Sequence, residues 1–163
     1  MDKKDKLIGL MMDHDAGDPW MIQHFIKVHE FSRLIGTMEG LSADEMEILE
    51  AASIVHDIGI KVSREKYGES TGKLQEKEGP EHARRLLKSL DYPEDAIKRV
   101  SYLVAHHHTY DDIDGRDYQI LVEADFLVNL YEKGKEKGAV EKVYAEIFRT
   151  ESGRKLCRNM FGI

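Results

Sequence analysis

The sequence predicts an all-α fold, a single-domain bundle of about six to eight helices. Three observations predict it. Strand signals are scarce, because no run alternates apolar and polar residues between turn residues. Helix start and stop signals, by contrast, recur along the chain. The 163 residues suit one domain, 1–163, that buries its own core, and neither a repeat nor an interdomain linker interrupts them.

The first predicted helix covers about 18–39. Asp18 followed by Pro19 is typical of an N-cap and a first-turn proline, and Gly36 or Gly40 ends the helix.

A capping box predicts the second helix, at about 42–57. Ser42 and Glu45 have the spacing at which each side chain accepts a hydrogen bond from the other residue's backbone N–H. Glycines at 59, 68 and 72 then indicate a long loop over 60–78.

Further helices are predicted from proline, glycine and apolar periodicity. Gly79-Pro80-Glu81 and Pro93 each mark a start, and polar residues make a loop at 109–116. The predicted ranges are 79–90, 93–107, 117–133, 139–148 and 151–161.

Composition limits the classes of function. A net charge of −7 argues against binding of long nucleic acid, which needs a basic surface, although small nucleotides stay open. The single Cys157 excludes an internal disulfide and a cysteine-based zinc cluster. The sequence has no apolar run of about 18 residues, so it predicts no membrane span. The N-terminal segment lacks a signal-peptide cleavage site. We therefore expect a cytoplasmic protein without a membrane partner.

His24 lies on the apolar face of the first predicted helix. Its neighbours on that face are Val28, Phe31 and Ile35, which form one buried stripe. His29 lies towards the flank, so His24 is the better inward-facing candidate. Taken alone, a histidine in this position is more often a hydrogen-bonded core residue than a metal ligand.

His56-Asp57 is a stronger signal, because it ends a run whose composition implies burial on most sides. An ionised aspartate there costs several kcal/mol unless a cation or a donor compensates it. Adjacent helical residues point about 100° apart, so one cation held by both must sit at the helix end. Gly59 leaves room there for the chain to turn. The alternative is a histidine stabilised by the helix dipole beside an exposed aspartate.

The remaining candidates are weaker singly. His82 lies in the first turn of its predicted helix among charged residues and is, by itself, more often a surface residue. In the run 106–108, His107 is the best inward-facing candidate, with His108 second and His106 on the flank. Asp125 falls on the core-facing stripe of its helix, with Glu123 and Asn129 as alternative polar partners.

Together these residues resemble the HD-domain superfamily of metal-dependent phosphohydrolases, whose pattern is H…HD…D. His24 with Val28 stands some thirty positions before His56-Asp57, as the family's first histidine does, and Asp125 looks like the closing aspartate. The resemblance implies a helical HD fold over about 20–130, followed here by C-terminal helices at 139–161.

With the additional His82 and the pair His107-His108, the pattern resembles that of the binuclear branch of the superfamily. By this resemblance one metal is held by His24, His56, Asp57 and Asp125, and a second by Asp57, His82, His107 and His108. The glycine-tyrosine-proline segment of the HD-GYP branch is absent, so cleavage of cyclic dinucleotides is not implied.

The implied reaction is hydrolysis of a phosphoester or nucleotide phosphoanhydride by metal-activated water, with Asp57 holding one or two divalent metals. Histidine and carboxylate ligands suit iron, manganese or zinc. Lys61, one position later than the family's frequent HD-I-G-K lysine, and Arg84 are the cations expected to bind the substrate, and Lys61 could also offset charge during catalysis. The expected partner is a small phosphorylated molecule or a nucleotide.

Two other functions stay open at this point. Some di-iron relatives of the HD fold are oxygenases with a similar ligand set, and the chain could instead be a metal-binding regulatory or ligand-binding module without catalysis. Apolar residues in the tail could also serve a homodimer contact.

Overall fold

The computed structural model describes residues 1–163, and it contains nine helices and no strand. The all-α prediction is confirmed. The helices are α1 (Lys3–His14), α2 (Pro19–Met38), α3 (Ala43–Val55), α4 (Gly59–Tyr67), α5 (Gly72–Ser89), α6 (Glu94–His106), α7 (Arg116–Glu132), α8 (Lys137–Ile147) and α9 (Glu151–Phe161).

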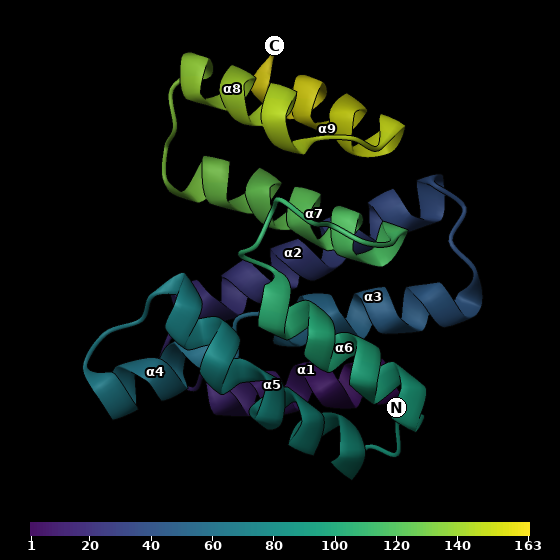
Figure 1. Ribbon diagram of the computed structural model, residues 1–163, viewed down its shortest axis with the longest axis vertical. Helices are drawn as coiled ribbons and strands as arrows, with labels where there is room; N and C mark the ends of the chain where they lie inside the picture. Colours follow the sequence, from purple (N-terminus) through teal and green to yellow (C-terminus); the bar gives the residue numbers. More distant parts are fainter.

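The helices form three groups along the long axis of the molecule (Figure 1). In the middle, α2 packs against both α3 and α7. Towards one end, α5 packs against α4 and α6, and α1 lies against α3. At the other end, α8 and α9 form a pair that covers α7. None of the nine helices combines the length and the apolar character needed to cross a bilayer.

The start signals read from the sequence act as expected in α2 and α3. The Asp18 carboxylate accepts a hydrogen bond from the Met21 N–H at 3.0 Å, and Pro19 is the first residue of α2. Ser42 and Glu45 form the reciprocal capping box at the start of α3. Caps of this kind satisfy backbone N–H groups that have no partner inside the helix.

The prediction of a long loop over 60–78 is wrong. Most of this segment is helical: α4 ends at Tyr67, Gly68 closes it in the left-handed conformation (φ 76°), and Thr71 caps α5. Pro80 lies inside α5 instead of at its start.

Close helix packing explains the glycines that resembled loop breaks. A Cβ atom at Gly59 would lie 2.6 Å from the Gln75 carbonyl oxygen, and one at Gly79 would lie 2.8 Å from Val104 Cγ1. Both distances are too short for a side chain, so these glycines let α5 pass directly over the start of α4 and over α6. The glycines mark helix contacts here, and this contact fixes the chain just after His56-Asp57.

A further helix, α1, was not predicted. The Asp2 side chain caps it by accepting from the Asp5 N–H at 2.8 Å, and Leu7 and Met11 are buried. The apolar run near the N-terminus is therefore one face of a helix that packs on α3.

Candidate metal centre

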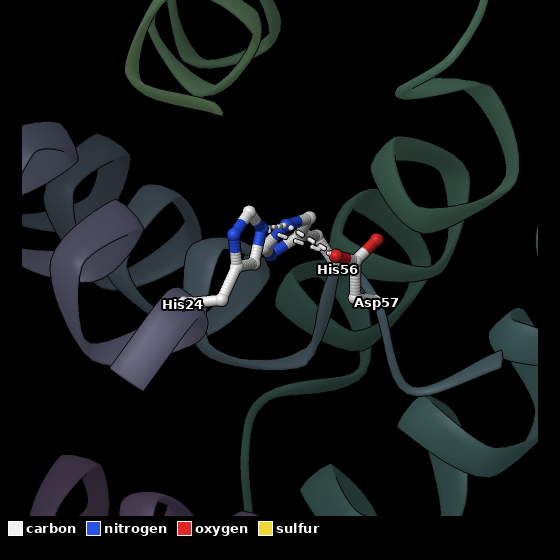
Figure 2. A group of neighbouring side chains, drawn as sticks. All are labelled: His24, His56 and Asp57. Atoms are coloured by element: carbon white, nitrogen blue, oxygen red, sulfur yellow. Dashed lines mark hydrogen bonds and ion pairs between the residues drawn. The ribbon is translucent and has the colours of Figure 1, made fainter. Parts of the chain in front are cut away.

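Four predicted ligands from three separate segments converge on one point. His24 lies on α2, His56 and Asp57 follow the end of α3, and Asp125 lies on α7. His24 Nε2 is 3.3 Å from His56 Nε2 and 3.2 Å from both Asp57 Oδ2 and Asp125 Oδ1. His56 Nε2 is 3.3 Å from Asp57 Oδ2 and 3.5 Å from Asp125 Oδ1. Figure 2 shows the imidazole nitrogens of His24 and His56 directed towards each other and towards the Asp57 carboxylate.

These separations match the spacing of ligand atoms around one small cation. Zinc binds imidazole nitrogen and carboxylate oxygen at about 2.0–2.2 Å. Atoms that far from a common ion, at tetrahedral or octahedral angles, lie roughly 3.0–3.5 Å from one another. The observed contacts of 3.2–3.5 Å fall in that range.

The orientation of His56 and His107 leaves a lone pair for a metal. His56 Nδ1 donates to the Ser53 carbonyl at 2.8 Å, and His107 Nδ1 donates to the Val104 carbonyl at 2.9 Å. A carbonyl oxygen only accepts, so in each neutral ring Nδ1 carries the proton and Nε2 carries the lone pair. In neutral rings, the Nε2 lone pairs of His56 and His107 then face carboxylate oxygens, and a bound cation would resolve this repulsion. The donor set therefore fits a divalent transition metal.

A second group of potential ligands shares Asp57 with the first. Asp57 Oδ1 is 3.2 Å from His107 Nε2, and Asp57, His107 and His108 offer ligand atoms that all lie within 4.8 Å of one another. His108 Nε2 donates to Gln75 Oε1 at 2.7 Å, which leaves Nδ1, 3.5 Å from the Tyr110 hydroxyl, as the atom that could bind a metal. Asp57 thus presents one oxygen to each group.

Without metal, the cluster holds protons in place of cations. Burial by itself lowers the pKa of His24, but the hydrogen bonds with Asp125 and Asp57 outweigh it and raise the pKa to about 10. Burial also opposes the charge on His56, yet the adjacent Asp57 raises the pKa of this imidazole well above its usual range. Burial would raise the pKa of Asp57, and the charge of His56 lowers it instead. His108 differs, because burial and the neighbouring His107 lower its pKa to about 4, so it is neutral at pH 7.

These shifts give a pH dependence for the metal-free protein. The folded-state pKa of His24, about 10, exceeds the unfolded value of 6.5, so the stabilisation from its proton is complete below pH 6.5 and is lost as the pH rises towards 10. We expect the melting temperature of chelator-treated protein to fall by roughly 5–10 °C between pH 6.5 and 9. Zinc-loaded protein should lack this decline, because the metal has already displaced the protons. Melting curves of the two forms across this range test it, and an equal slope in both would contradict it.

His82 does not join either group. Gly72 and Gln75, at the start of α5, lie beside His108. His82 comes seven residues after Gln75, about 10 Å further along the helix. Neither group of potential ligands includes His82, so its role in a second metal site stays a prediction.

Arg84 also lies away from the centre. Its Nη2 atom donates to Glu94 Oε1 at 2.7 Å, at the start of α6. His107 follows the other end of that helix, about 20 Å away at 1.5 Å per residue. The substrate contact of Arg84 stays a prediction, and its guanidinium is paired with Glu94 in this structure.

Lys61 lies closer, four residues after Asp57. Its ammonium group donates to the His14 carbonyl at 2.6 Å and lines a cavity of about 200 Å³ together with Asp15, Met21 and Arg64. Met21 is one helical turn before His24, but none of the predicted metal ligands lines this cavity.

Three supporting side chains complete the centre, and two of them were not predicted. Asn129 Nδ2 donates to Asp125 Oδ1 at 2.8 Å, so this alternative partner orients a ligand. The unpredicted pair is Gln75, which holds His108, and Glu132, whose Oε2 is 2.9 Å from His24 Nδ1. Glu132 lies seven residues after Asp125, on the same helical face, and that spacing is the signal that could have found it.

The site borders the solvent through aromatic residues. Trp20 is 50% exposed and its ring stacks on His24. Tyr110 is partly exposed, packs on Phe126 and approaches His108 Nδ1. A larger surface cavity, about 460 Å³, lies elsewhere, beside α1 and α3.

The fold and the site define a helical protein with a buried histidine–aspartate centre suited to divalent metals. The chain belongs to the HD domain family, whose model matches residues 21–149 and so includes His24, His56, Asp57 and Asp125. A crystal structure described as a predicted HD superfamily hydrolase from an uncultured Thermotogales bacterium is similar, with a TM-score of 0.70 and 23% sequence identity. The alignment covers 97% of this chain and 84% of that one. No curated protein matches the chain.

Proposed function

We propose that this protein is a metal-dependent phosphohydrolase that cleaves a phosphoester or a nucleotide phosphoanhydride. The observation that carries the proposal is the position of Asp57, whose two carboxylate oxygens face two separate groups of metal ligands. Such an arrangement suits two cations that together contact one phosphate group. Membership of the HD domain family supports the same class of chemistry.

The predicted ligands form two groups, one for each metal. His24, His56 and Asp125 would hold one cation, His107 and His108 the other, and Asp57 would bridge them. When bound, the metals would supply an activated water for attack on phosphorus and positive charge opposite the phosphate oxygens. Hydrogen bonds from Asn129 to Asp125 and between Gln75 and His108 keep these ligands in place.

Lys61 is the substrate-binding cation in this proposal. One of its three N–H donors is used by the His14 carbonyl, which leaves two for a phosphate oxygen. The ammonium lines a cavity of about 200 Å³, which is large enough for a phosphate-sized group, and Lys61 follows Asp57 by four residues. Its positive charge there would bind an anionic part of the substrate and offset negative charge that develops on it.

A panel of phosphorylated compounds tests the proposal. Protein loaded with manganese, iron or zinc would be assayed against p-nitrophenyl phosphate, bis(p-nitrophenyl) phosphate and a set of nucleotides, with and without oxygen. We expect hydrolysis of at least one class of compound, loss of this activity with chelator, and the same rate under anaerobic conditions. Activity that requires oxygen would indicate an oxygenase, and a metal-loaded protein inert towards the whole panel would favour a regulatory module.

A further inference from the structure

We propose that Glu132 and Lys27 are positioning residues that set the metal affinity of the group containing His24. The inference rests on the metal centre of the proposed function, but not on the reaction that this centre catalyses. It concerns a relay of three side chains, His24, Glu132 and Lys27, that connects a buried ligand to the protein surface.

His24 differs from the other ligand histidines in how its ring is held. His56 and His107 each donate Nδ1–H to a backbone carbonyl three residues earlier, so the end of their own helix orients them. His24 Nδ1 is instead 2.9 Å from Glu132 Oε2, on a helix that is 108 residues away in sequence. Among these three rings, His24 alone has a charged side chain as its Nδ1 partner.

This pair is buried, so its interaction is poorly screened by water. The His24 side chain is 1% exposed and that of Glu132 is 4% exposed. A carboxylate that accepts from one imidazole nitrogen fixes the ring and makes the other nitrogen a stronger donor to a metal. Residues in this position typically contribute 10–100-fold to metal affinity. Glu132 thus presents the Nε2 lone pair of His24 to the centre.

Lys27 moderates the effect of Glu132. Its ammonium nitrogen is 2.7 Å from Glu132 Oε1, the second carboxylate oxygen, and its side chain is 34% exposed. Lys27 follows His24 by three residues on α2, so both contact Glu132 from the same helical face. The lysine compensates a buried negative charge that would otherwise attract a cation more strongly.

Substitutions of Glu132 and of Lys27 should change the Zn²⁺ affinity in opposite directions. This difference distinguishes an effect of charge from a general loss of structure. Glu132→Gln keeps an oxygen that can accept from His24 but removes the negative charge, so Zn²⁺ should bind 10–100-fold more weakly. Lys27→Met leaves the negative charge uncompensated, so Zn²⁺ should bind several-fold more tightly. Glu132→Gln removes the ion pairs with His24 and Lys27, and Lys27→Met removes only the second, so both variants should melt at a lower temperature without metal.

The experiment measures Zn²⁺ dissociation constants of the full chain by chelator competition, with the Co²⁺ absorption spectrum as a report on the ligands. Glu136→Gln and Lys133→Met, which change exposed neighbours, are the matched controls and should bind Zn²⁺ like the wild type. Unchanged affinity in Glu132→Gln, or weaker binding in both Lys27→Met and Glu132→Gln, would overturn the inference.

The same measurements, together with the assay of hydrolysis, distinguish a failure of this inference from a failure of the proposed function. If the expected affinities are found while the wild type hydrolyses no phosphorylated compound, the inference stands and the proposed reaction falls. If the wild type binds no Zn²⁺, both fall.

Discussion

Asp57→Asn should remove metal from both ligand groups and lower kcat/KM for the best phosphorylated substrate by on the order of 10³-fold or more. The carboxylate offers Oδ2 to the group with His24 and Oδ1 to the group with His107. An asparagine keeps the shape but loses the charge and one of the two ligand oxygens. Metal content by mass spectrometry and turnover by phosphate release are the measurements.

Two variants make this prediction specific. Asp125→Asn affects only the first group, so metal held by Asp57, His107 and His108 should persist. Asp111→Asn changes an exposed loop residue and should leave both metal content and turnover unchanged. Circular dichroism should show intact helices in all three proteins, and full activity of Asp57→Asn would rule out the assigned centre.

Glu123→Ala should lower the free energy of unfolding by about 2–4 kcal/mol and the melting temperature by roughly 5–15 °C. Glu123 is fully buried on α7 and accepts from the backbone N–H groups of Arg149 and Thr150, at 2.6 and 2.8 Å. It also accepts from the Thr150 hydroxyl and from Gln119. The carboxylate therefore fastens the start of α9 to the core, and its loss leaves these donors without their buried acceptor.

Urea denaturation measures this effect, with Glu141→Ala, on the exposed face of α8, as the control. Because Glu123 contacts α9 and not the histidines, the Glu123→Ala protein should bind as much metal as the wild type. A change within about 0.5 kcal/mol, the usual range for surface substitutions, would contradict the role assigned to Glu123.

The residues that converge in the structure were conspicuous in the sequence because they are polar residues at positions with the pattern of burial. Apolar helical faces are interrupted by His24, His56, Asp57 and Asp125. Burying such polar groups costs free energy unless they have a partner, so their positions indicate a site. The helix starts at Asp18 and Ser42 were also predicted, because capping depends on residues close in the chain.

The segment after the centre was misread for a physical reason. Glycine is common both in loops and where two helices pass closely, and sequence alone does not separate these uses. Gly59 and Gly79 serve close packing, and Pro80 is tolerated inside α5. That helix begins at Gly72, earlier than predicted, and its contact with His108 is made by Gln75, seven residues before His82.

Glu132 was missed because its role exists only in the folded chain. It ends α7 among polar residues, where a glutamate is ordinarily solvated. Its spacing of seven residues from Asp125 places it on the same face of α7, but its contact with His24 and Lys27 depends on how α2 packs on α7.

Anomalous diffraction from crystals grown with zinc tests the central claim most directly. We expect two peaks on either side of the Asp57 carboxylate, one bonded to His24, His56 and Asp125, and the other to His107 and His108. An absence of peaks in this cluster, or zinc bound by a set of ligands without Asp57, would contradict the account.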